Sequence, residues 1–167
     1  MGVISSIYDQ LGLLSPLTIR WKIEIAKLHK MEDIKWDTVL EGDMDIKWKR
    51  LLEEIVMLPV IVFDRSVKPR GCKGPPEIFG YFDGGSAAFG AVVYLRYERQ
   101  SPGLDGHTHE VRLLGSKAKI GSKTIPRQEI DGCLILHRFI TAILPGMVEL
   151  PSAINIYWRL QCCHHHS

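Results

Sequence analysis

Two carboxylates stand in segments whose other residues are mostly apolar. Asp83 lies within IFGYFDGGSAAFGAVVYL, residues 78–95, which otherwise has the composition of a buried strand. An ionised Asp in such a strand is costly unless a metal, a basic residue or solvent at the strand end compensates its charge. The two glycines that follow Asp83 fit a β-turn equally well, and an Asp is common there. The local sequence leaves both interpretations open.

Glu129 lies in the segment with the strongest helical pattern, residues 124–144. Thr124 is suited to cap this helix, and Pro126 to its first turn. Gly132 would let the helix approach a sheet closely. An alternative interpretation is a Glu near a helix N-terminus that is favoured only by the helix dipole. Against it, Glu129 belongs to a stripe at helical spacing that should pack on a sheet: Ile125, Glu129, Cys133, Leu136 and Ile140.

A strand Asp and a helical Glu that meet beside one sheet could bind a divalent cation. Mg²⁺ prefers oxygen ligands, and one or two carboxylates can hold it together with water and substrate phosphates. The sequence therefore predicts a candidate Mg²⁺ site with Asp83 and Glu129 as its ligands.

Basic residues cluster just before and within the start of the same helix. They could contact the phosphate backbone of a nucleic acid, or they could form a solvated basic surface, and the residue types do not decide between these. The formal net charge of +2 and a pI of about 8.3 neither require nor exclude nucleic acid. The residues are Lys117, Lys119, Lys123 and Arg127.

The elements that must position these residues form two regions. Residues 1–64 are predicted to be helical, with apolar residues at helical spacing over about 15–28 and 43–57 and a short strand at 58–64. Residues 65–77 carry three prolines, two glycines and several basic side chains, which predicts a linker.

From residue 78 onward the pattern changes to strands. Alternation and turn residues predict strands over about 78–83, 88–96 and 110–120, followed by the helix and a fourth strand at 153–160. This order predicts a mixed α/β fold, in which the small helical region precedes a sheet.

The length of 167 residues suits one domain, or one domain and part of another. No apolar run is long enough for a transmembrane helix, and the N-terminus lacks the pattern of a secretory signal. The four cysteines are therefore expected to be free thiols. Residues 161–167 are expected to be a tail outside the fold.

Four stretches resemble the polyproteins of Bel/Pao-type LTR retrotransposons, where the reverse transcriptase ends and the RNase H domain begins. In family order they are SIYDQLGLLSPLTIRWKI, FGYFDGGSAAFGAVVYLR, VRLLGSKAKI and TIPRQEIDGCLIL. The resemblance implies a thumb or connection region over residues 1–64 and an RNase H-like domain over 78–160. That fold has three antiparallel strands, a helix and a fourth strand parallel to the first.

The resemblance also implies a function. Asp83 and Glu129 match the family's first and helical acidic residues, so they would be both catalytic residues and metal ligands. RNase H chemistry uses two Mg²⁺ ions that clamp the scissile phosphate of an RNA–DNA hybrid. The third acid should follow the fourth strand, but Arg159 and Leu160 occupy that place, and a fourth would lie later. We therefore expect a truncated or degenerate domain with weak Mg²⁺ binding and little or no hydrolysis.

The implied partners are an RNA–DNA hybrid and the rest of the Pol polyprotein, in the cytoplasm and in a virus-like particle context. One alternative is a non-catalytic nucleic-acid-binding or structural remnant. A second is an actin-like phosphate-binding domain. The stretch DGGSAAFGAVV resembles the first phosphate loop of such domains. An aspartic peptidase is not expected, because FDGGS has Gly where that motif needs Thr or Ser.

Overall fold

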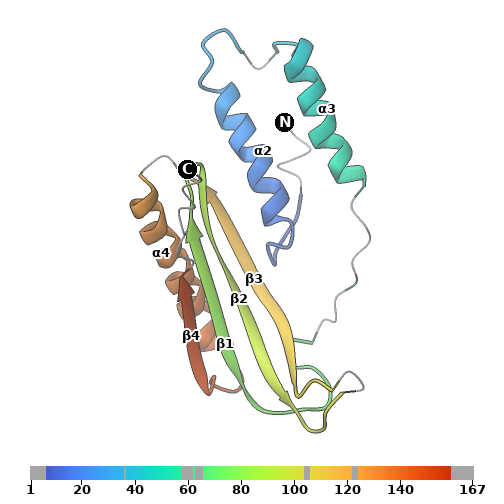
Figure 1. Cartoon of the computed structure of the whole chain (residues 1–167), viewed down its shortest axis with the longest axis vertical. Coiled ribbons are helices and arrows are strands. Elements are labelled where there is room, and N and C mark those ends of the chain that lie inside the picture. The colour runs from blue at the N-terminus through green and yellow to red at the C-terminus, as the bar shows by residue number, and fades with distance from the viewer. Residues whose placement is uncertain are drawn as a thin grey trace, which may run out of the picture.

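The computed structural model describes residues 7–35, 37–57, 62, 66–103, 106–121 and 124–158. Two helices come first, and a sheet with a third long helix follows (Figure 1). The elements are α2 (Ser15–Leu28), α3 (Gly42–Val56), β1 (Cys72–Gly84), β2 (Ala88–Arg99), β3 (His109–Ile120), α4 (Ile125–Ile143), the short 3-10 turn η1 (Leu144–Gly146) and β4 (Ala153–Trp158). Within these residues no helix is long and apolar enough to cross a membrane.

The four strands form one mixed sheet in the order β3-β2-β1-β4. β1 pairs antiparallel with β2 and parallel with β4, and β2 pairs antiparallel with β3. A parallel neighbour requires a crossover, which α4 provides between β3 and β4. The predicted α/β class and the predicted strand and helix order are confirmed. β1 is a central strand, so Asp83, paired with Gly90, lies near the middle of the sheet's width.

The core lies between α4 and one face of the sheet (Figure 1). Ile78 of β1 and Val93 of β2 are fully buried there, and Leu136 of α4 is nearly so. A Cβ atom at Gly80 would lie 2.8 Å from Leu136 Cδ1, so this glycine makes room for the Leu136 side chain. Burying a Leu or Ile side chain contributes about 1.5–3 kcal/mol, so this interface is the main source of stability in the sheet region.

The predicted stripe on α4 is only partly correct. Leu136 and Ile140 are buried, but Cys133 is exposed and Ile125 is 40% exposed. A step of four residues advances by about 40° around a helix, so the series Ile125, Glu129, Cys133 turns away from the sheet. The residues that are buried on α4 are Gln128, Gly132, Ile135, Leu136 and Ile140.

β1 begins at Cys72, within the segment predicted as a linker. Prolines lack an N–H group and argue against a strand interior. Pairing with β2 is nevertheless recorded at Lys73 and again from Glu77, with a shift of register between them. Gly74, with φ of +66°, lies in that irregularity.

The predicted strand at 58–64 falls almost entirely outside the described residues.

The helical region has its own buried residues, and ion pairs join its two helices. Trp21 and Leu28 of α2 and Leu51 of α3 are buried. Lys47 Nζ of α3 lies 2.6 Å from a carboxylate oxygen of Glu24 in α2. Hydrogen bonds from Lys27 and Lys47 hold the pKa of Glu24 below its ordinary value of 4.5.

Gly84→Ala should destabilise the protein by about 1–3 kcal/mol, as other overpacked sites do. The added Cβ would lie 2.8 Å from the Cα atom of Glu129 and closer still to its nitrogen, and neither backbone atom can rotate away. Gly85→Ala is the matched control, because its Cβ would make an ordinary contact of 3.6 Å with Ala88 O. Urea unfolding of both variants measures the difference, and equal midpoints would contradict the packing described.

Glu24→Gln should cost about 1 kcal/mol or less near neutral pH, as a partly exposed ion pair does. Because the folded pKa is lowered, this stabilisation is present above the unfolded pKa and is lost as pH falls through the folded value. The stability difference between wild type and variant should therefore vanish in acid. Urea unfolding over a pH series measures it, with the exposed Glu41→Gln as control.

Candidate functional site

Asp83 lies one residue before the end of β1, and its side chain is half-buried. The backbone N–H of Gly84 donates a hydrogen bond of 2.8 Å to its Oδ1 atom. Across the described residues, no ion pair involves this carboxylate. A carboxylate has about four acceptor sites, so most of the hydrogen-bonding capacity of Asp83 remains for another group.

The end of β1 and the start of α4 touch through their backbones. A Cβ atom at Gly132 of α4 would lie 3.1 Å from Asp83 O, and one at Gly84 would overlap the backbone of Glu129. Gly132 thus has the role that the sequence predicted for it. Two glycines, one on each element, allow a helix to approach a strand this closely. The structure therefore brings the end of β1, at Asp83 and Gly84, against the first turns of α4, at Glu129 and Gly132. That the two carboxylates meet at one ion stays a prediction.

The two side chains leave this contact on different sides of β1. Gly80 and Gly84 face α4, so alternation places Asp83 on the opposite face of the sheet. Glu129 is half-buried on the helix that covers the first face. Convergence of the two carboxylates on one ion would occur around the end of the strand, which lies one residue beyond Asp83.

If Asp83 and Glu129 converge around the strand end, their two carboxylates would supply protein ligands for one Mg²⁺ ion and not for two. Two carboxylates, with water and substrate phosphates, satisfy the usual coordination of Mg²⁺. A clamp of two ions needs more acids, and the part of the chain that the structure describes contains no group of three or more potential ligands. Arg159 and Leu160, which occupy the place of the expected third acid, lie outside the described residues.

Asp83 lines a hollow of about 550 Å³ on the face of the sheet opposite α4, here called the open-face hollow. Small residues of β2 and β3, such as Gly90 and Ala118, contribute to its lining. The rings of Tyr81 and Tyr157 form one wall, stacked 5.1 Å apart with an interplanar angle of 17°. A carboxylate beside small residues and aromatic rings leaves room for a ligand against the sheet.

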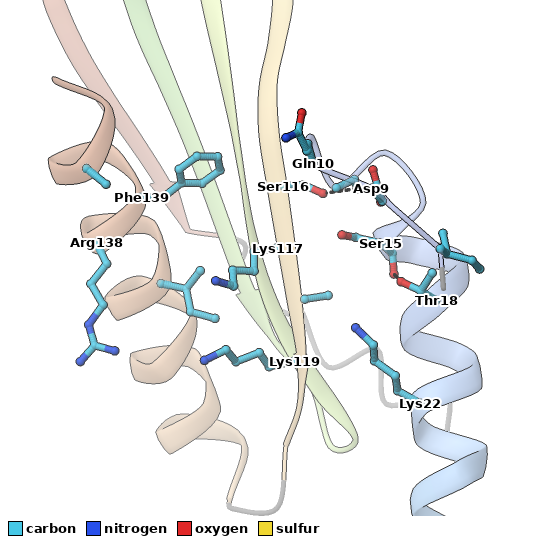
Figure 2. A pocket seen from close by; sticks show the side chains of 15 residues that line it. Asp9, Gln10, Ser15, Thr18, Lys22, Ser116, Lys117, Lys119, Arg138 and Phe139 are labelled. Atoms are coloured by element: carbon cyan, nitrogen blue, oxygen red, sulfur yellow. Dashed lines mark hydrogen bonds between the residues drawn. The ribbon is translucent and has the colours of Figure 1, made fainter. Parts of the chain in front are cut away.

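A second hollow, of about 580 Å³, lies between α2, β3 and α4, and we call it the basic groove (Figure 2). Four cationic side chains line it: Lys22 of α2, Lys117 and Lys119 of β3, and Arg138 of α4. Figure 2 shows Lys117 and Lys119 extending from β3 on the side of α4, and Lys22 reaching from α2 toward β3.

The predicted basic cluster is thus only partly gathered in this groove. Arg127 is exposed in the first turn of α4 and does not line the groove, and Lys123 lies outside the described residues. Lys22 and Arg138 were not predicted. Each is an ordinary exposed cation on the polar side of its helix, and only the tertiary structure brings it beside Lys117 and Lys119.

The segment before α2 docks on the edge strand β3 and so forms the groove. The Ser116 N–H donates a 2.7 Å hydrogen bond to Leu11 O, and Ser116 Oγ donates one of 2.6 Å to Gly12 O. Gly12 has φ of +70°, and a Cβ there would lie 2.7 Å from the Ser116 carbonyl carbon. Asp9 accepts hydrogen bonds from the N–H groups of Leu13 and Leu14, which fixes the turn that leads into α2.

The comparison with protein families agrees with this fold. The family model described as Pao retrotransposon-like RNaseH-like domain matches residues 1–158, which include both the helical region and the sheet. The chain therefore belongs to this family. No curated protein matches the chain.

Gly12→Ala should release the docked segment from β3, because the added methyl group would overlap the Ser116 backbone. We expect the Ser116 amide, which donates to Leu11 O, to exchange its hydrogen faster, while the amide of buried Val93 is unchanged. Gly42→Ala is the control, because Gly42 also has a positive φ but no atom within 4 Å of its Cβ position. Equal Ser116 exchange in the two variants would contradict the docking.

Proposed function

We propose that this member of the Pao retrotransposon-like RNaseH-like domain family is part of a retrotransposon Pol polyprotein that binds an RNA–DNA hybrid. In this proposal Asp83 and Glu129 hold a Mg²⁺ ion weakly, and the chain cleaves the RNA strand slowly or not at all. The observation that carries the proposal is the glycine contact between β1 and α4, where the strand end that follows Asp83 meets the backbone of Glu129. The two carboxylates would then reach one ion around the end of the strand. The match to the family over residues 1–158 supports the nucleic-acid partner.

Each residue has a defined part in this proposal. Asp83 is oriented by the Gly84 N–H, which donates a hydrogen bond to Oδ1, and Oδ2 would bind the ion. Glu129 is fixed by its place on α4, whose buried neighbours Gln128 and Gly132 hold the helix against the sheet. A bound Mg²⁺ would supply charge neutralisation for a phosphate placed between the two carboxylates.

The proposed low activity follows from the number of acids. Two-ion hydrolysis requires carboxylates for both the ion that activates water and the ion that stabilises the leaving oxygen. Among the described residues no group of three or more potential ligands occurs, and Asp83 and Glu129 together would serve one ion. Arg159, at the place of the expected third acid, would add a positive charge where the second ion needs a negative one.

A second candidate function is hybrid binding without any role for metal. It is favoured by the basic groove, whose lining contains four cations and one carboxylate, that of Asp9. Phosphate contacts alone give affinity that falls steeply with salt and needs no divalent ion. Magnesium dependence therefore separates the two candidates.

Asp83→Asn and Glu129→Gln should each weaken Mg²⁺ binding by about tenfold or more, a loss of at least about 1.4 kcal/mol. Amide chemical shifts of Gly84 and Glu129 during a Mg²⁺ titration measure the affinity. The controls are Asp43→Asn and Glu53→Gln, which remove exposed carboxylates of α3. Shifts that are the same in all variants would contradict the metal site and leave the metal-free candidate.

The same variants test activity on a hybrid with a labelled RNA strand. We expect little or no cleavage by the wild-type chain in Mg²⁺. Metal-dependent cleavage that Asp83→Asn abolishes would contradict the low activity and establish an enzyme. Nucleotide hydrolysis without nucleic acid would instead indicate the actin-like alternative.

A further inference from the structure

The basic groove holds four positive charges that no ion pair between the described residues neutralises. The ion pairs between described residues involve other cations, among them Arg20, Lys47 and Lys68. None of them involves the four cations of the groove. The one carboxylate in its lining, Asp9, already accepts two backbone hydrogen bonds. Concentrated, uncompensated charge in a hollow raises the local potential and attracts an anionic ligand.

The arrangement of the four cations suits an extended polyanion. Lys117 and Lys119 are two residues apart on one strand, so they point to the same side with about 7 Å between their Cα atoms. Lys22 reaches toward them from α2, and Arg138 is contributed by α4 (Figure 2). The charges are thus distributed over three elements, whereas a site for one small anion would gather its donors around a single point.

The basic groove adjoins the open-face hollow that contains Asp83. Four residues line both: Ser15, Ser116, Lys117 and Ala118. A chain of phosphates bound by the groove can therefore continue over β3 toward Asp83. In the adjoining hollow the residues Tyr81 and Tyr157 are 41% and 45% exposed, and exposed tyrosine rings can stack with nucleobases.

We propose that the basic groove binds the sugar–phosphate backbone of one nucleic-acid strand and directs that strand toward Asp83. Lys22, Lys117, Lys119 and Arg138 contact phosphates in this arrangement. The helical region is then part of the binding surface, because α2 supplies one wall and Lys22. This inference rests on the proposed function, since it assumes a nucleic-acid ligand, but it assigns contacts that do not depend on a metal.

The test is the salt dependence of binding of the full chain to a fluorescent RNA–DNA hybrid, followed by anisotropy without divalent ions. Each lost phosphate contact lowers the slope of log K against log salt by about 0.7–0.9. Changing all four groove cations to Gln should therefore reduce the slope by about 3. The control changes Lys30, Lys35, Arg50 and Arg70 to Gln, which alters the net charge equally but leaves the groove intact.

Four outcomes are distinguishable. A slope reduced by the groove variant and unchanged by the control supports the inference. Hybrid binding with equal slopes in both variants overturns the groove but leaves the proposed function. No salt-dependent binding by the wild type overturns both. Tighter binding of polyglutamate than of hybrid, lost in the groove variant, also overturns the inference, because the groove would then serve an acidic protein.

The groove variants should remain folded, because all four side chains are on exposed residues. Urea unfolding of each variant verifies this. Single variants add a further check: Lys22→Gln should lower the slope by about as much as Lys117→Gln. If the slope changed only in the variants of Lys117 and Lys119, α2 would not belong to the binding surface. That result would contradict the assignment of Lys22.

Discussion

The arrangement of this protein depends on the close contact between the end of β1 and the start of α4. A helix normally stands away from a sheet by the thickness of the side chains between them. Here Gly84 and Gly132 remove that layer, and the backbone of Glu129 rests directly against the strand. The same two glycines therefore bring α4 close to the strand end and set the spacing between the segments that carry Asp83 and Glu129.

A second close contact, between Gly12 and Ser116, joins the helical region to the sheet. Gly12 has no side chain, and Ser116 donates two hydrogen bonds to this segment, from its N–H to Leu11 O and from its Oγ to Gly12 O. Because of this contact, the helical region and the sheet share a surface. The basic groove exists only where α2 meets β3 and α4, so neither region could form it alone.

Much of the fold and part of the site could be predicted from local patterns. The order of elements follows from alternation and helical spacing, and Asp83 and Glu129 stand out because a carboxylate is costly in an apolar segment. The buried face of α4 was harder to predict. Residues at four-residue steps drift around the helix, so the predicted stripe wrongly included Cys133, which is exposed. The start of β1 was missed because Gly74 and two prolines are typical of a loop. The strand nevertheless continues across a shift in its pairing register with β2. Lys22 and Arg138 could not be found, since nothing local distinguishes them from other exposed cations.

The docking of Leu11 and Gly12 on Ser116 has a consequence for solubility. β3 is an edge strand, and a free edge exposes N–H and C=O groups that can pair with another molecule and begin aggregation. The bond from Ser116 N–H to Leu11 O occupies part of this edge. Lys117 and Lys119, next to it on the same strand, repel an incoming copy of the chain. The docked segment and the two lysines thus hinder strand-to-strand association along β3.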